Sequence, residues 1–289
     1  MTDSSTTKTS DLYSSPYLVD YYDIVAPSSD SVDDASFYWD VYQELQSLRS
    51  PTPNDPFIVM DVGTGTGRVI HGFATKAVEL NAEFINTKFL GVDNAQHMLD
   101  KAPYITREFM QEHVQWVLGS ALNLEDVMKE TEHQYVDLLI FSIGSISHLS
   151  EPGQPETFLN QVSKVLRPDT GRAYVSIYDG SLLKKKENVA FHQPEGVAEI
   201  ESKMYPLITY RESNHGGTLE GNVKYVKFDL EVLSRVDGEE NILERNQVSM
   251  KMRQWGEDEI VHLAAGTGVS FVESKRGKHE TFYVFKTEV

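Results

Sequence analysis

The chain has 289 residues, of which 40% are hydrophobic, and this length allows one large domain or a core with an elaboration. It carries 44 acidic and 26 basic residues, a formal charge of −18, and so negative a surface repels phosphate backbones and argues against a nucleic acid partner. Cysteine is absent, which excludes disulfides and thiolate metal sites. With no apolar run of membrane-spanning length and no signal-peptide pattern, we expect a cytoplasmic protein without a membrane partner.

The N-terminal part of the chain is expected to lie outside the main fold. Residues 1–10 are rich in Ser and Thr and poor in apolar side chains, which predicts a disordered tail. Residues 11–56 form a separate segment with several clustered tyrosines, among them Tyr22, and with a helix predicted over Phe37–Leu48. A proline-rich stretch, 51–56, then leads stiffly into the first strand of the core.

From residue 57 to about residue 180, apolar runs alternate with helical patterns. The predicted strands are Phe57–Asp61, Phe89–Asp93, Val114–Leu118, Val136–Phe141 and Ala173–Tyr178. The predicted helices between them are Val69–Leu80, Gln96–Met110 with a break at Pro103, Leu124–Glu130 and Glu156–Leu166. Strands that alternate with helices predict a parallel sheet with right-handed crossovers.

The pattern changes over residues 181–254, where we predict a β insertion. Val226–Val232 and Val248–Met252 alternate apolar and polar residues, which indicates antiparallel strands with one wet face. A further strand is expected within Glu199–Tyr210, and Asp237 with Gly238 signals a turn. The α/β pattern returns in residues 255–289, with a helix over Glu257–Ala265 and two last strands. The predicted core is therefore made of residues 57–180 and 255–289.

The most informative motif follows the first predicted strand. That strand ends in Asp61, and glycines follow at positions 63, 65 and 67. Glycines there let the chain turn tightly and let a ligand approach the backbone. A dinucleotide-binding G-x-G-x-x-G fingerprint would need its third glycine at position 68, where the chain has Arg68. The spacing therefore argues against a nicotinamide cofactor, although an NAD(P)-dependent oxidoreductase stays open as an alternative.

This D-x-G-x-G-x-G pattern resembles motif I of the class I S-adenosylmethionine-dependent methyltransferases. The resemblance extends from about residue 13 to residue 289, and the β insertion is similar to one in small-molecule branches near the glycine N-methyltransferase type. It implies an α/β fold with a doubly wound, mostly parallel, seven-stranded Rossmann-like sheet and an antiparallel β insertion before the last helix and strands. It also implies S-adenosyl-L-methionine as cofactor and a small-molecule substrate.

Each part of this cofactor is expected to be recognised by a different kind of residue. Asp93, at the tip of the second strand, suits the ribose hydroxyls, although it could instead cap the next helix, a role that Asn94 could take over. Asp61 is expected to orient the glycine-rich loop or to meet the cofactor amine through water. The backbone expected to lie against the methionine and ribose parts is that of Gly63, Thr64, Gly65 and Gly67.

The resemblance assigns further cofactor contacts to the segments after the later strands. Ser120 and Ala121 would read the adenine edge, and Ser142 would begin a segment beside the sulfonium and the substrate. Met98 could cover the adenine face or be an ordinary core residue. Tyr22 would belong to a lid over the cofactor, with plain packing as the competing interpretation.

Methyl transfer is an in-line displacement in which the protein mainly supplies proximity and a dry site. An amine nucleophile needs only to arrive neutral, whereas a hydroxyl needs a general base, and His148 is the best-placed candidate for that base. Asp179, at the end of the fifth strand, could orient a substrate amine or act as a structural cap. The sequence thus predicts transfer to an N or O nucleophile, with a non-catalytic binding or partner subunit as the alternative and a homodimer possible.

Overall fold

The computed structural model describes residues 7–26, 34–183, 197–236 and 238–288. The chain divides into two compact units. The core unit consists of Pro27–Leu183 and Trp255–Val289, and the sheet unit consists of Met1–Ala26 and Lys184–Gln254.

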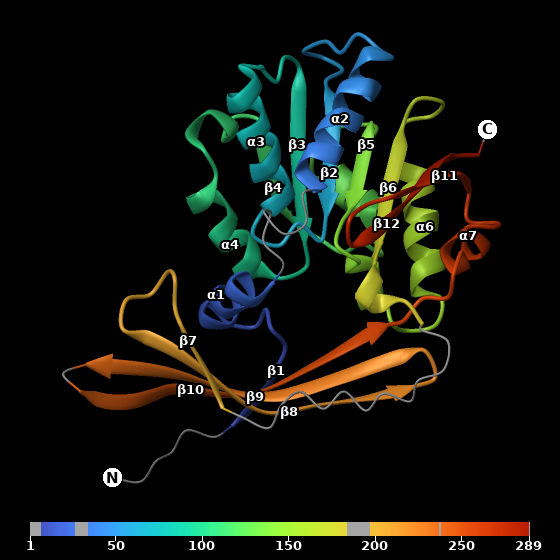
Figure 1. Cartoon of the computed structure of the whole chain (residues 1–289). Helices are drawn as coiled ribbons and strands as arrows, with labels where there is room; N and C mark the ends of the chain where they lie inside the picture. Colours follow the sequence, from blue (N-terminus) through green and yellow to red (C-terminus); the bar gives the residue numbers. More distant parts are fainter. Residues whose placement is uncertain (1–6, 27–33, 184–196, 237, 289) are drawn as a thin grey trace. The chain divides into compact units, whose positions relative to one another are not determined.

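The core unit is built on a seven-stranded sheet in the order β11-β12-β6-β5-β2-β3-β4 (Figure 1). Its strands are β2 (Phe57–Val62), β3 (Thr87–Asp93), β4 (Val114–Leu118), β5 (Leu138–Phe141), β6 (Arg172–Tyr178), β11 (Val269–Arg276) and β12 (Glu280–Thr287). The strands from β2 to β6 pair in parallel, and β12 runs antiparallel to β6. All six residues of β2 are buried because helices cover both faces of the sheet.

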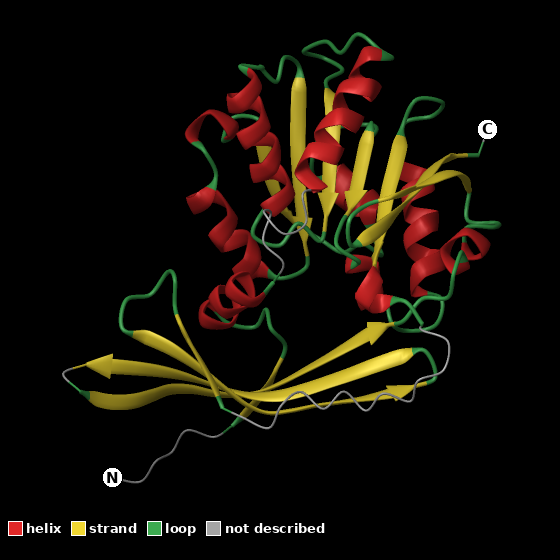
Figure 2. Cartoon of the chain, viewed as in Figure 1, coloured by secondary structure: helices red, strands yellow, loops and turns green. Residues whose placement is uncertain are grey.

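Helices lie on both faces of this sheet (Figure 2). They are α2 (Asp34–Ser47), α3 (Arg68–Leu80), α4 (Gln96–Ile105), α5 (Leu124–Lys129), α6 (Gln154–Val165) and α7 (Glu259–Leu263), with single 3₁₀ turns η1 (Glu108–Met110), η2 (Ser145–His148) and η3 (Asp179–Ser181). One apolar cluster joins α2 and α3 to the sheet and contains Tyr42, Phe73 and Phe89. A second joins α5, α6 and α7 to the other face and contains Phe141 and Phe158.

The order of the strands creates a switch point between β2 and β5. From β2 the chain moves outward through β3 to β4, and it then returns to the other side of β2 to form β5 and β6. In open parallel sheets, ligands bind in the crevice outside the carboxyl ends of the strands at such a point. The loop after β2 and the segment after β5 are therefore the first places to look for a site.

The sheet unit contains a five-stranded sheet in the order β1-β10-β9-β8-β7 and the helix α1 (Pro16–Val25). Its strands are β1 (Lys8–Ser10), β7 (Ala198–Glu201), β8 (Ile208–Glu220), β9 (Val223–Val236) and β10 (Glu239–Arg253). Leu18 and Tyr21 of α1 share an apolar cluster with Tyr210 and Phe228 of the sheet. The helix is thus part of the hydrophobic core of this unit.

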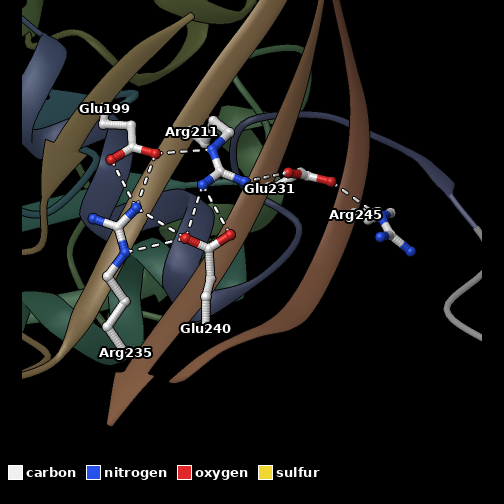
Figure 3. Close-up of polar contacts among 6 residues, drawn as sticks. All are labelled: Glu199, Arg211, Glu231, Arg235, Glu240 and Arg245. Carbon is white, nitrogen blue, oxygen red and sulfur yellow. Dashed lines mark hydrogen bonds and ion pairs between the residues drawn. The ribbon is translucent and has the colours of Figure 1, made fainter. Parts of the chain in front are cut away.

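Arginine and glutamate side chains form an ion-pair network across strands β7 to β10 of the sheet unit (Figure 3). Arg211 contacts Glu199, Glu231 and Glu240, with bonds between 2.8 and 3.2 Å. Arg235 shares Glu199 and Glu240 with it. These side chains are partly or largely exposed, so water and salt screen their attraction.

The predicted fold class is confirmed, but the structure corrects three details. Lys8–Ser10 was expected to be disordered and instead pairs in parallel with β10, because an edge strand needs backbone partners rather than apolar side chains. The expected segment 11–56 is divided, with α1 in the sheet unit and α2 in the core unit. The strand expected within 199–210 is split between β7 and β8. Residues 1–6 and Asp237 of the predicted turn lie outside the described residues.

Two features are absent from the described residues. No helix there is long and apolar enough to cross a membrane. Nor do three or more His, Asp or Glu side chains of those ranges gather in an arrangement that could hold a metal ion.

Candidate active site

The glycine-rich loop after β2 is fastened to two strands. The hydroxyl of Thr64 donates to Asp61 Oδ2 at 2.7 Å, and the Thr64 N–H donates to the carbonyl of Val92 in β3 at 2.9 Å. The Gly65 N–H donates to Asp93 Oδ2 at 2.8 Å. The loop is therefore held in one conformation by side chains and backbone at the carboxyl ends of β2 and β3.

Gly67 can only be glycine for two separate reasons. Its φ of +89° lies in the left-handed region, and a Cβ built there would stand 2.5 Å from Cη2 of Trp116. Gly63 and Gly65 also have positive φ, at +63° and +58°. Trp116 of β4 thus packs against the loop, a contact that sequence reasoning missed because β4 is distant along the chain.

Asp61 carries a buried carboxylate at the end of β2. The residue is 1% exposed, and its Oδ1 has no hydrogen-bond partner among the described residues. Burial raises the pKa of Asp61 to about 7, and the hydrogen bond from Thr64 only partly offsets this rise. Because a buried carboxylate oxygen is stabilised by a donor or a cation, this atom is suited to receive one from a ligand.

Asp93 serves the loop and the following helix at once. Its Oδ1 accepts from the Ala95 N–H at 2.9 Å, and its Oδ2 accepts from the Gly65 N–H at 2.8 Å. Asn94 itself is exposed, and α4 begins after Ala95, whose methyl group cannot cap it. Burial raises the pKa of Asp93 although these bonds oppose the shift. A carboxylate has about four acceptor positions, so these two bonds leave room for a ligand hydroxyl.

The residues predicted beside adenine lie on neighbouring elements. Met98 of α4 is 2% exposed, and its Sδ lies 4.0 Å from where a Cβ of Gly65 would be. Ser120 follows β4, and its hydroxyl accepts from the Leu122 N–H at 3.1 Å, which stabilises the turn there. Ala121 is half-buried and packs against the core.

The segment after β5 lies against the glycine-rich loop. A Cβ at Gly63 would stand 3.2 Å from Cε2 of Phe141 and 3.5 Å from Cβ of Ser145. Ser142 is buried, and its hydroxyl accepts from Nη2 of Arg68 at 3.2 Å. The loops after β2 and β5 thus form two adjoining walls at the switch point.

His148 and Asp179 were the predicted candidates for proton transfer and substrate orientation. His148 ends η2 and is solvent-exposed, yet the surrounding protein displaces enough water to lower its pKa, so the imidazole is neutral at pH 7. Asp179 forms a bidentate ion pair with Arg276, at 2.7 and 2.6 Å. The Asp179 carboxylate, which was a candidate to orient a substrate amine, is therefore already paired with the Arg276 guanidinium.

Comparisons with known proteins agree with this geometry. Residues 59–169 match the protein family described as "Methyltransferase domain". Over 282 residues the chain is 31% identical to the N-methyltransferase FrzE of Cladobotryum sp, and the match covers 96% of each protein. The chain belongs to the class I S-adenosylmethionine-dependent methyltransferases. It is an enzyme whose cofactor is S-adenosylmethionine, which sets aside the oxidoreductase and the non-catalytic alternatives.

Solved structures show the same fold at low sequence identity. The sugar N-methyltransferase KedS8 from Streptoalloteichus sp ATCC 53650 has a TM-score of 0.64 at 13% identity, with 100% of this chain and 99% of that chain covered. CalS10 with bound S-adenosylmethionine, an amino pentose methyltransferase from Micromonospora echinaspora, has a TM-score of 0.58 at 16% identity, with 97% and 100% covered.

The residues of this methyltransferase fit its cofactor. Oδ1 of Asp61, which has no hydrogen-bond partner within the described part of the chain, offers an acceptor to a cationic group, and the cofactor carries an ammonium and a sulfonium. Three glycines with positive φ line the loop beside that acid without a Cβ in the way. Tyr22 lies in the sheet unit, where its ring packs edge-on against Tyr13 at 5.5 Å, and its role toward the cofactor stays a prediction.

A buried polar cluster beside this site was missed by sequence reasoning. Arg68 forms a bidentate ion pair with the buried Asp34, at 2.6 and 2.8 Å. The Tyr38 hydroxyl and Glu280 Oε2 are buried nearby, without hydrogen-bond partners among the described residues. The sequence marks only Arg68, as the residue after Gly67. Asp34 and Tyr38 come from α2 and Glu280 from β12, near the two ends of the sequence of the core unit.

Proposed function

We propose that this methyltransferase transfers a methyl group to an amine nitrogen of a small molecule. The observation that carries the proposal is the match to a protein named an N-methyltransferase, with 31% identity over 96% of both chains. The net charge of −18 supports it, because an acidic surface attracts amines, which are cationic in solution.

In this proposal the donor lies across the carboxyl ends of β4, β3 and β2. Adenine, ribose and sulfonium follow one another in the donor, and the candidate residues follow the same order across these strands. Ser120, Ala121 and Met98 are the proposed adenine contacts. Asp93 takes a ribose hydroxyl, and the backbone of the glycine-rich loop supports the methionine part.

Asp61 is assigned to the donor ammonium. Its hydrogen bond with Thr64 fixes the carboxylate, and Oδ1, to which no residue that the structure describes donates, is left to accept from the ammonium. An ionised acceptor makes stronger hydrogen bonds than a neutral one. Ser142 begins the wall that lies beside the sulfonium and the acceptor, since its segment adjoins the loop at Gly63.

When bound, S-adenosylmethionine supplies a methyl carbon activated by its sulfonium. The protein's part is to hold the acceptor in line with that carbon and to exclude water. The acceptor nitrogen must arrive with a free lone pair, and it carries a surplus proton after methylation. We assign His148 to receive that proton, because it ends η2 in the segment after β5 and its lowered pKa keeps the imidazole neutral at pH 7.

A labelled-methyl assay tests the proposed function. The enzyme is incubated with the labelled donor and matched pairs of small molecules in which an amine replaces a hydroxyl, and products are identified by mass spectrometry. We expect label on the amine nitrogen and little on the matched alcohol. Label transferred mainly to hydroxyl oxygen would contradict N-methylation.

A further inference from the structure

His71, near the start of α3, is bonded to the glycine-rich loop that precedes this helix. Its ring Nε2 lies 3.0 Å from the carbonyl oxygen of Thr66. A carbonyl oxygen can only accept, so Nε2 carries a hydrogen and donates it. The backbone N–H of His71 donates to the carbonyl of Gly67 at 2.9 Å. One residue of the helix therefore holds the carbonyls of two successive loop residues.

The peptide between Thr66 and Gly67 is held at both of its polar groups. Its carbonyl accepts from the ring of His71, and its N–H donates to the carbonyl of Thr64 at 2.9 Å. The peptide is trans and therefore planar, so these two bonds point to opposite sides of the chain. Together they oppose a rotation of the whole peptide plane.

This loop needs such support because of its composition. Gly63, Gly65 and Gly67 all have positive φ, and glycine loses more conformational freedom on ordering than any other residue. Gly67 is also the N-cap of α3, and it has no side chain with which to bond to the first turn. Neighbouring residues must therefore fix the conformation of the loop.

Trp116 confines the same part of the loop. A Cβ at Gly67 would stand 2.5 Å from Cη2 of Trp116 and 3.1 Å from Nε2 of His71. A Cβ at Gly91 of β3 would stand 2.4 Å from Cε3 of Trp116, so the indole packs against glycines of both the strand and the loop. The ring centroids of His71 and Trp116 are 6.4 Å apart. Gly67 thus has little room to move.

We propose that His71 is a positioning residue that pre-organises the glycine-rich loop for the methyl donor. A loop that already has its bound conformation loses less entropy on binding, which raises affinity. The bond acts on backbone that supports groups common to S-adenosylmethionine and to S-adenosylhomocysteine, the compound left after transfer. Both compounds should therefore gain equally from it. This inference rests on the placement of the donor in the proposed function.

Isothermal titration calorimetry of both compounds tests this role. In His71→Leu, which lacks a side-chain donor, both dissociation constants should rise about fivefold, as expected for one lost hydrogen bond. His71→Gln offers an amide N–H at a similar reach to Nε2 and should keep both constants within about twofold of the unaltered enzyme. His71→Asn, whose amide is one carbon shorter, should behave like the leucine variant and carries the test if that variant does not fold.

His262 provides the matched control. It lies in α7, is exposed, and its ring Nδ1 likewise bonds to a backbone carbonyl, that of Asp258, at 3.0 Å. His262→Leu should leave both dissociation constants unchanged, because that carbonyl belongs to the cap of α7 and not to the glycine-rich loop.

Two further readouts separate positioning from general damage to the fold. With saturating donor, kcat of His71→Leu should stay within about twofold of the unaltered enzyme, because the lost support is common to the ground state and the transition state. Without ligand, the amides of residues 64–67 should exchange with deuterium faster in His71→Leu than in His71→Gln.

The contradicting outcomes are distinct. Unchanged affinity in His71→Leu, weakening of only one of the two compounds, or a His71→Gln variant that binds as weakly as the leucine variant would overturn the positioning role alone. A large loss of kcat at saturating donor would also overturn it. Failure of the unaltered enzyme to bind either compound would overturn the donor site together with this role, whereas methylation of hydroxyl oxygen would contradict only the proposed N-methylation.

Discussion

At the scale of single residues, the burial and charge of Asp61 give the clearest indication of what the site binds. Its carboxylate is buried among charged groups, Arg68, Asp34 and Asp93, and one of its oxygens lacks a hydrogen-bond partner among the described residues. A carboxylate in such surroundings is held by a cation or takes up a proton. The pKa of about 7 therefore places the change of charge in an accessible pH range.

We expect donor affinity to depend on pH through this residue. Below about pH 7 the Asp61 carboxyl is protonated and cannot pair with an ammonium, and above it the carboxylate is ionised. Affinity for S-adenosylmethionine should therefore rise as pH increases from 6 to 7.5, by at most about tenfold per pH unit. Titration calorimetry across this range checks it.

The matched variant for that experiment is Asp61→Asn. The asparagine oxygen can still accept from Thr64, so the loop keeps its anchor while the titrating group is lost. The variant should bind S-adenosylmethionine more weakly than the unaltered enzyme at pH 7.5, and its affinity should vary less with pH. An identical pH dependence in the variant and the unaltered enzyme would assign the effect to another group.

At the scale of elements, two glycines with positive φ separate backbone strain from crowding. A Cβ added to Gly67 (φ +89°) would stand 2.5 Å from Trp116, whereas one added to Gly153 (φ +82°), before α6, would have no described atom within 4 Å. Gly153→Ala should lower the free energy of unfolding by about 1 kcal/mol from strain alone. Gly67→Ala should lower it by about 3 kcal/mol, because overpacking adds to the strain.

Urea denaturation of both variants measures this difference, with the dependence on urea concentration checked for a two-state transition. Equal destabilisation by the two substitutions would show that Trp116 moves aside easily. The glycine-rich loop would then be less tightly packed than the structure indicates.

The attachment of α1 to its sheet gives a second test at this scale. Asp20 is 1% exposed and accepts from Tyr210 Oη at 2.9 Å and from the Ser202 hydroxyl at 2.6 Å. Asp20→Ala should lower the free energy of unfolding by about 2–4 kcal/mol, because two buried hydroxyl donors lose their charged acceptor. Glu240→Ala, in the exposed network of Figure 3, should barely change the midpoint of urea denaturation. A larger effect for Glu240 than for Asp20 would contradict this ranking.

At the scale of the whole molecule, local patterns accounted for the order of the core elements. The strand at Phe57 and the helix after Gly67 were predictable because an apolar run and a helical periodicity are local patterns of neighbouring residues. Gly67 was also recognisable from its spacing, although its contact with Trp116 was not. The antiparallel insertion was recognisable from the alternation in β9 and β10.

Features that depend on distant contacts could not be predicted. Lys8–Ser10 forms a strand only because β10 offers it a free edge. Glu280 and Tyr38 reach the site from opposite ends of the core unit, and no local pattern marks either of them. The division of the N-terminal segment between two units likewise follows from the packing of α1 on the sheet, through Tyr21 and Tyr210.

Titration calorimetry of the unaltered protein with S-adenosylmethionine, and separately with NAD, tests the central claim most directly. We predict saturable binding of one donor molecule per chain, no measurable uptake of NAD, and at least about tenfold weaker donor binding in Asp93→Ala. Saturable binding of NAD together with no uptake of S-adenosylmethionine would contradict the account.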